Sequence, residues 1–155
     1  MKALKITLLA VLAVLVVLVV AAPIGPMPGL FIGGSPAAAP AQWPDTSATH
    51  EIRLRVPGLL PRVVIIWVIE HGGELHVVGA KDSGWVRMLG AGAPVEMRLD
   101  DETYTLNAAP VTDGWQDVLT AYVDKYRPDY PDIIDGFPTI EEAEGEVVVF
   151  RLNRS

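Results

Sequence analysis

Polar and apolar residues alternate along much of the chain after residue 50. From Glu51 to Val56 the even-numbered side chains are apolar and the odd-numbered ones are charged, which is the pattern of a half-buried strand. Arg62–Glu70 (RVVIIWVIE) is instead a nearly continuous β-branched run, typical of a central strand buried on both faces. His71-Gly72-Gly73 turns the chain into a third strand, Glu74–Gly79, and so predicts a hairpin.

The second half of the chain adds three strands and two helices. A short helical segment, Trp85–Leu89, is stopped by glycines and Pro94, and two alternating segments after it predict a second hairpin. In Gly114–Tyr126 apolar residues recur every three or four positions, which predicts an amphipathic helix capped by Asp113 or Thr112. The remaining predicted strands are Val95–Leu99, Tyr104–Val111 and Glu146–Leu152, and Tyr130–Gly145 is predicted as an irregular acidic arm.

The order β-β-β-α-β-β-α-β with hairpin connections indicates a fold class. We predict a mainly β (α+β) domain in which a six-stranded antiparallel sheet curls into a small barrel with two helices.

The N-terminal region has a different pattern. Ile6–Ala22 contains no charge and a single polar residue, and its extension through Ile24 approaches the length that spans a bilayer. Lys2 and Lys5 precede it, so we predict a single-pass transmembrane helix with a cytoplasmic N-terminus and an extracytoplasmic domain, periplasmic in a Gram-negative cell. A signal peptide is the alternative, because the run ends in small residues. The predicted organisation is a membrane anchor over residues 1–24, a Pro/Gly/Ala-rich linker over 25–47 and the folded domain over 48–155.

Composition excludes several classes of protein. Apart from Lys2 and Lys5 there are ten basic and nineteen acidic residues, a net charge of about −9, and no basic cluster, so nucleic acid is not an expected partner. The absence of cysteine excludes disulfides, a thiol nucleophile and thiolate metal ligands. His71 and His76 lack the spacing of a zinc-binding pair, and no metal site is predicted.

The candidate chemistry lies where Glu74–Gly79 passes into the short helix. The turn Ala80-Lys81-Asp82-Ser83-Gly84 would bring together backbone N–H groups, a lysine, a serine hydroxyl and the start of a helix, which is the composition of an anion pocket. The alternative is an ordinary polar turn in which the serine caps the helix.

The segment from Leu75 to Leu89, followed by Pro94-Val95, resembles the split β-barrel proteins of the pyridoxamine-phosphate-oxidase-like superfamily. Within that group it is most similar to the deazaflavin (F420)-dependent nitroreductase branch, whose pattern W-x-x-N-L-x-x-x-P-x-V is matched approximately by Trp85, Leu89 and Pro94-Val95. Met88 stands where that pattern has asparagine.

This resemblance implies a split β-barrel and a cofactor, FMN or F420, whose phosphate lies beside the strand-to-helix turn. The residues that it assigns to cofactor binding are Lys81, Ser83, Gly84, Trp85 and Arg87. The implied chemistry is hydride transfer carried by the cofactor.

Tyr122 and Tyr126 share a face of the second helix, and the resemblance implies that such tyrosines line the substrate pocket, so they are the candidate catalytic residues. The alternative is core packing with the phenol groups at the rim.

Two functions follow as hypotheses. The first is a membrane-anchored oxidoreductase of the nitroreductase or quinone-reductase type, possible as a homodimer, with a small or quinone-like acceptor. The second is a non-catalytic, membrane-tethered ligand-binding or assembly module that has lost cofactor binding.

Overall fold

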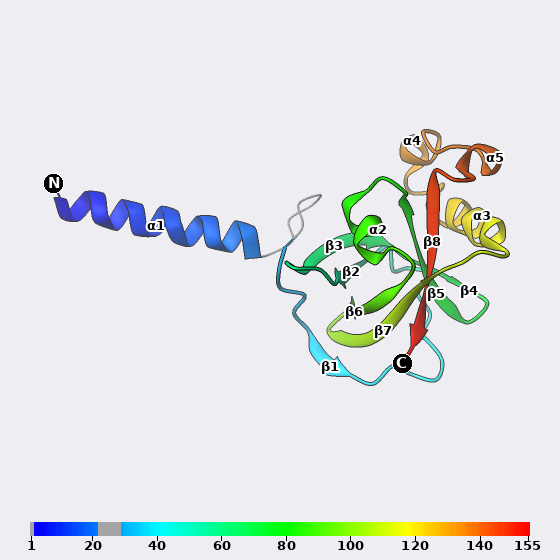
Figure 1. The fold of residues 1–155 in the computed structure, drawn as a ribbon, viewed down its shortest axis with the longest axis horizontal. Coiled ribbons are helices and arrows are strands. Elements are labelled where there is room, and N and C mark those ends of the chain that lie inside the picture. The colour runs from blue at the N-terminus through cyan, green and yellow to red at the C-terminus, as the bar shows by residue number, and fades with distance from the viewer. Residues whose placement is uncertain (1, 22–28) are drawn as a thin grey trace.

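The computed structural model describes residues 2–21 and 29–155, and within the first helix it describes the side chains of residues 7–17. Helix α1 (Lys2–Ala21) is followed by a curled sheet with four further helices (Figure 1). The strands are β1 (Ser35–Ala37), β2 (Glu51–Val56), β3 (Arg62–Trp67), β4 (Ile69–His71), β5 (Glu74–Ala80), β6 (Ala93–Leu99), β7 (Glu102–Pro110) and β8 (Val147–Arg154). The other helices are α2 (Gly84–Leu89), α3 (Trp115–Tyr126), α4 (Pro131–Ile134) and α5 (Ile140–Ala143).

Seven of the strands form one antiparallel path in the order β3-β2-β6-β7-β8-β5-β4, and β1 adds in parallel to the start of β7. The two ends of this path, β3 and β4, are consecutive in the chain and are separated only by Val68. One apolar run therefore supplies both ends of the sheet. This connection requires the sheet to curl round on itself, which is the barrel that the sequence predicts.

The prediction of one central strand over Arg62–Glu70 is wrong. The backbone changes partners at Val68, because β3 pairs with β2 while β4 pairs with β5. Both halves lie at sheet ends, and β3 is only half-buried. The predicted hairpin to Glu74–Gly79 is present as the short β4–β5 pair.

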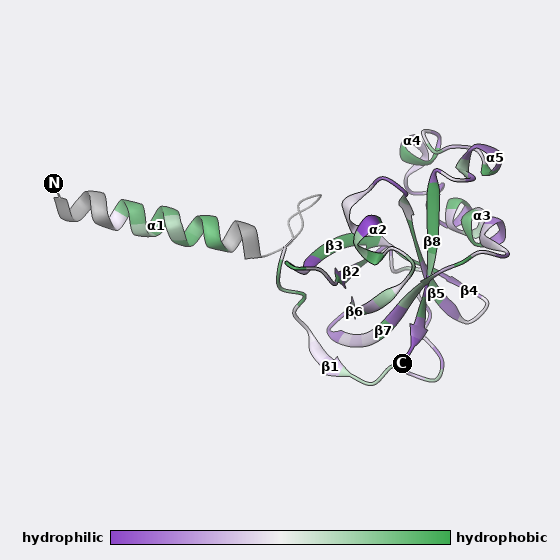
Figure 2. Cartoon of the chain, viewed as in Figure 1, coloured by the Kyte–Doolittle hydropathy of each residue, from purple (hydrophilic) through white to green (hydrophobic). Residues whose placement is uncertain are grey.

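Two hydrophobic cores stabilise the fold. Alternate residues of β2, β5, β6, β7 and β8 fill the barrel interior, with Leu54, Met97 and Phe150 fully buried. A second core lies between α3 to α5 and the outer face of the sheet, and it contains Val118, Tyr126 and Val149. β8 serves both cores, and this explains why Figure 2 shows most of it as hydrophobic.

The described chain has eight strands where the sequence predicts six, and four helices after α1 where the sequence predicts two. The acidic arm is partly helical: α5 begins with a capping box in which Thr139 and Glu142 satisfy each other's backbone N–H groups. Neither predicted cap begins α3, because Gly114 takes that position in the left-handed conformation (φ 73°) with no side-chain cap.

Residues 29–47, which fall within the predicted linker, pack against the barrel. Gly29 forms an antiparallel bridge with Val63, β1 pairs with β7, and Trp43 is only 6% exposed. Its ring meets Tyr104 edge-on, with centroids 5.2 Å apart, and lies under the guanidinium of Arg154. This segment therefore covers the barrel.

Helix α1 is twenty residues long, and its described side chains are exposed and, apart from Thr7, apolar (Figure 2). Among the described residues, no helix combines the length and apolarity that crossing a membrane requires. The transmembrane helix is therefore not confirmed and stays a prediction.

Candidate strand-to-helix site

The turn between β5 and α2 is held in place by close packing of Trp85 on β5. The Trp85 side chain lies over Gly79, where an added Cβ atom would come within 2.2 Å of the indole Cζ2, and its ring centroid is 6.0 Å from that of Phe150. Gly79 is therefore needed so that the indole can lie on the strand. The ring occupies the space directly above the strand end.

Replacing Gly79 by alanine should destabilise the fold. The added methyl group would overlap Trp85 and Val86, so we expect the free energy of unfolding to fall by about 1–3 kcal/mol in urea denaturation. Gly84→Ala is the matched control, since a Cβ atom there meets nothing within 4 Å. Equal stabilities of the two variants would show that Trp85 does not lie on Gly79.

The polar groups of the turn are only partly free to bind an anion. The Lys81 N–H donates to the carbonyl of Glu146 (2.8 Å), and the Ser83 N–H donates to that of Ala80 (3.0 Å). These two amides are already used within the protein. The first-turn N–H groups of α2, from Gly84 onward, remain as possible donors.

The side chains of Lys81 and Ser83 differ in their surroundings. Lys81 is exposed, as are Gly84 and Arg87. Ser83 occupies the N-cap position of α2, but its hydroxyl makes no cap hydrogen bond; Oγ is buried and has no partner among the described residues. The capping role, which is the alternative for this serine, is therefore not realised. A hydroxyl of this kind keeps its full capacity to donate and accept a hydrogen bond.

Tyr126, by contrast, is fully buried and its phenol oxygen is saturated. The oxygen accepts from the Val68 N–H (2.9 Å) and lies 2.7 Å from the Val68 carbonyl and 2.6 Å from that of His50, to either of which it can donate its proton. The ring stacks on Trp67 with centroids 4.2 Å apart, and burial raises its pKa. This geometry favours core packing for Tyr126.

Tyr122 lies in the same aromatic cluster. It is 4% exposed, its ring centroid is 4.9 Å from that of Tyr126, and burial raises its pKa also. A substrate-lining role for these two tyrosines stays a prediction.

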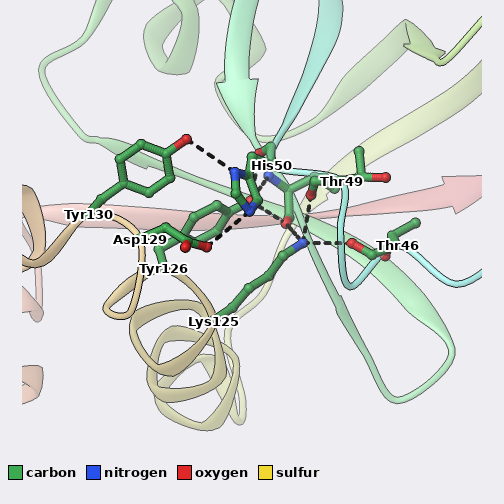
Figure 3. A network of polar contacts seen from close by, with 8 residues as sticks. Thr46, Thr49, His50, Lys125, Tyr126, Asp129 and Tyr130 are labelled. Atoms are coloured by element: carbon green, nitrogen blue, oxygen red, sulfur yellow. Dashed lines mark hydrogen bonds and ion pairs between the residues drawn. The ribbon is translucent and has the colours of Figure 1, made fainter.

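Lys125, the residue before Tyr126, also binds the backbone of Val68 and of the segment before β2. Its ammonium group donates to the carbonyls of Thr46 (2.9 Å), Thr49 (2.8 Å) and Val68 (2.9 Å), as Figure 3 shows for the two threonines. Burial lowers its pKa, and the carboxylate of Asp45 opposes that effect. Lys125 and Tyr126 together satisfy the backbone polar groups of Val68, the residue at which the strand changes partners.

His50 extends this network toward the surface. Its Nδ1 is 3.1 Å from the Tyr130 hydroxyl and its Nε2 is 3.2 Å from Asp129 (Figure 3). Lys125, Tyr126 and His50 therefore form one hydrogen-bond network around the backbone of Val68. Sequence reasoning missed Lys125 and His50. The sequence carries no signal for these roles, because the carbonyl partners of Lys125 lie 57 to 79 residues away along the chain.

A cleft of about 290 Å³ lies beside the loop between β2 and β3. It is lined by the proline-rich β2–β3 loop and by Arg55, Glu96 and the Pro94-Val95 pair of the sequence pattern. Arg55 Nη1 donates to Glu96 at 2.6 Å, while its Nε is buried without a partner among the described residues. The structure therefore places Pro94-Val95 in this cleft, which neither Lys81 nor Ser83 lines.

His76 on β5 supplies a pH-dependent term in stability. It is 5% exposed, and burial lowers its pKa below the ordinary value of 6.5. Below about pH 6.5 the unfolded chain therefore binds a proton that the folded chain does not bind, so the free energy of unfolding should fall as the pH falls through that value. His76→Gln should show a shallower fall in denaturation curves between pH 7 and 5; identical slopes would contradict this assignment.

No protein-family model matches the chain, and no curated protein sequence matches it. Among solved structures, the FAD and heme binding protein from Mycobacterium smegmatis aligns with a TM-score of 0.51 and 18% identity. This alignment covers 70% of the present chain and 62% of that protein, so the chain spans less than two thirds of its length. The heme storage protein HutZ from Vibrio cholerae aligns with a TM-score of 0.50 and 14% identity, over 70% of this chain and 84% of HutZ.

At these identities the comparisons bear on the fold. The strand path of the curled antiparallel sheet ends in β3 and β4, which are joined by Val68. Together with the two alignments, this topology confirms the curled antiparallel barrel that the sequence pattern predicts. The chain therefore shares the split β-barrel fold of these two proteins.

Proposed function

We propose that this chain binds a flavin- or deazaflavin-type cofactor, FMN or F420, and reduces a small or lipophilic acceptor such as a quinone. The observation that carries the proposal is the buried Ser83 hydroxyl without a partner among the described residues, next to the exposed Lys81 at the start of α2. Support at the level of the fold comes from the Mycobacterium smegmatis neighbour, which is a FAD and heme binding protein. The nitroreductase branch is part of this proposal.

The residues at the turn fit a cofactor phosphate in part. Lys81 would pair with the phosphate as a compact charge, and the first-turn amides of α2 would add N–H donors. Ser83 would donate its hydroxyl after a side-chain rotation, because Oγ is buried in the described position. Arg87 lies on the same short helix and is exposed. The amides of residues 81 and 83 would not contribute, because protein carbonyls already occupy them.

The cofactor would supply hydride transfer when bound. The protein's own contribution would be to hold its anionic group and to offer the Trp85 ring as an apolar wall. Tyr122 stays the proposed acceptor-side residue together with Tyr126. The internal hydrogen bonds of Tyr126 limit it to a positioning role within that proposal.

Membrane attachment through the N-terminal region is a further part of the proposal. In α1 the large apolar side chains from Leu8 to Val17 are 52–72% exposed, and an apolar surface of that extent requires a covering partner. Lipid would be that partner, with the folded domain outside the cytoplasm. A homodimer is compatible with this arrangement.

A specific observation favours the second candidate, a non-catalytic ligand-binding or assembly module. The Trp85 ring fills the space above Gly79, and Tyr126 directs its hydroxyl into the protein. In this case the barrel would persist without a cofactor, and Lys81 would be a surface residue only.

An absorption spectrum and cofactor titration of the purified full chain in detergent distinguish the two candidates. Lys81→Ala should weaken the binding of FMN or F420 by the 1.5–3 kcal/mol of a charge-assisted contact, or about 10- to 150-fold. Arg127→Ala is the matched control, because it removes one positive charge at the end of α3, where Arg127 pairs with Asp135. Wild-type protein that binds neither cofactor, or binding that is insensitive to Lys81→Ala, would favour the module.

A further inference from the structure

The largest exposed apolar side chains of the barrel gather at one edge of the sheet. Leu59 is fully exposed and Leu60 is 68% exposed in the β2–β3 loop, and Phe31 is 70% and Leu30 is 43% exposed in the segment before β1. We call these four residues the apolar edge. Soluble surfaces rarely keep four such side chains together without a partner.

The backbone bridge between Gly29 and Val63 brings the two segments together. The N–H of each residue donates to the carbonyl of the other, at 2.9 and 2.7 Å. Leu30 and Phe31 follow Gly29 by one and two residues, and Leu59 and Leu60 precede Val63 by four and three. At about 3.3 Å per residue, all four lie within roughly 13 Å of the bridge.

The loop that carries Leu59 and Leu60 is supported from behind. A Cβ atom on Gly58 would come within 2.7 Å of the Met88 methyl group, so α2 packs directly against this loop. The two leucines therefore project from a loop that is packed against α2. They contribute nothing to either core, and their substitution should leave the fold intact.

Charge is distributed unevenly around the apolar edge. Residues 29–44 and 52–69, the two segments that meet at the bridge, contain three arginines and no acidic residue, although the chain has nineteen acidic residues. Arg55 pairs with Glu96 of β6, so its charge is compensated. Arg62 is exposed at the start of β3, between the loop and the bridge. Apolar side chains flanked by arginine suit the interface of a bilayer that contains anionic lipid.

The number of residues between α1 and Gly29 limits how far the apolar edge can lie from that helix. Gly29 follows Ala21 by eight residues, and an extended chain of that length reaches about 28 Å at most. A lipid phase that covers the exposed apolar residues of α1 is therefore within reach of the apolar edge.

We propose that the apolar edge inserts into the headgroup region of the bilayer and fixes the orientation of the barrel on the membrane. This proposal rests on the proposed membrane attachment. In this proposal the partner of the apolar edge is lipid. A second copy of the chain on the same surface is the competing outcome.

The absence of cysteine makes a site-specific test clean. Full-length Leu60→Cys and Phe31→Cys would each carry an environment-sensitive fluorophore, with Glu141→Cys on α5 as the exposed control. The labelled chains would be reconstituted into phosphatidylcholine vesicles with or without phosphatidylglycerol. Lipids with a nitroxide at the headgroup should quench the labels at 60 and 31 several-fold more than the label at 141, and phosphatidylglycerol should increase the difference.

Three results would overturn the proposal. Labels at 60 and 31 that are quenched only by an aqueous quencher, in vesicles that float with the protein, would disprove the insertion and leave the tether intact. Protein that does not float with vesicles would disprove the tether as well. Shielding that persists in detergent, together with a disulfide that links two unlabelled Leu60→Cys chains, would identify a second copy as the partner.

Discussion

Replacing Tyr126 by phenylalanine is expected to lower the free energy of unfolding by about 2–4 kcal/mol. The phenol oxygen contacts the Val68 N–H, the Val68 carbonyl and the His50 carbonyl, and it is the side-chain acceptor for that N–H. Each buried polar group left without a partner costs about 1–3 kcal/mol, and phenylalanine would leave the N–H and the His50 carbonyl without this partner. Urea denaturation of the full chain, followed by tryptophan fluorescence, measures the change.

Tyr130→Phe is the matched control for this variant. Its hydroxyl contacts His50 Nδ1 at a half-buried position. We expect that loss to cost about 0.5–1.5 kcal/mol, the net value of one hydrogen bond. If the two variants were equally stable, the Tyr126 hydroxyl would not hold the point at which the strand changes partners.

Replacing Lys125 by methionine is expected to cost a similar 2–4 kcal/mol. Methionine keeps much of the apolar stem, but it removes three donors from the carbonyls of Thr46, Thr49 and Val68. Hydrogen bonds to a charged group contribute about 1.5–3 kcal/mol each, and water can replace part of that loss at a half-buried site. Besides stability, the segment before β2 should become more mobile, with faster amide hydrogen exchange at residues 46–50.

Lys81→Met is the matched control, because it makes the same substitution at an exposed lysine. Surface substitutions usually change stability by less than about 0.5 kcal/mol. A loss of stability as large as that for Lys125→Met would show that the methionine side chain itself is the cause. No change in amide exchange at residues 46–50 would show that Lys125 does not bind this segment.

Local pattern is enough to predict the elements whose two faces differ in polarity. Glu51–Val56 is a strand over the predicted residues, since strict alternation fixes both the period and the buried face. Helix α3 begins one residue after its predicted start for the corresponding reason, a clear three- and four-residue repeat. The barrel is predictable because hairpin connections between alternating strands leave few other arrangements.

Continuous apolar runs carry no such information. In Arg62–Glu70 every residue from 63 to 69 is apolar, so nothing in the sequence marks Val68 as the point of change. The bend is set by partners distant in sequence: β2 on one side, β5 on the other, and Tyr126 and Lys125 on the backbone between them. Two polar residues on α3 thus acquire their roles only through tertiary contacts.

The candidate site shows the same division. Its turn and helix lie where the local residues predict them, and Ser83 stands at the N-cap position. The sequence by itself therefore determined most of the strands, helices α2 and α3, the curled sheet and the place of the turn. These features depend on residue periodicity and on short connections. Only the tertiary structure decided which amides the turn keeps free, which tyrosine is locked by hydrogen bonds and which leucines are left uncovered, because each depends on residues that the fold brings together from distant parts of the chain.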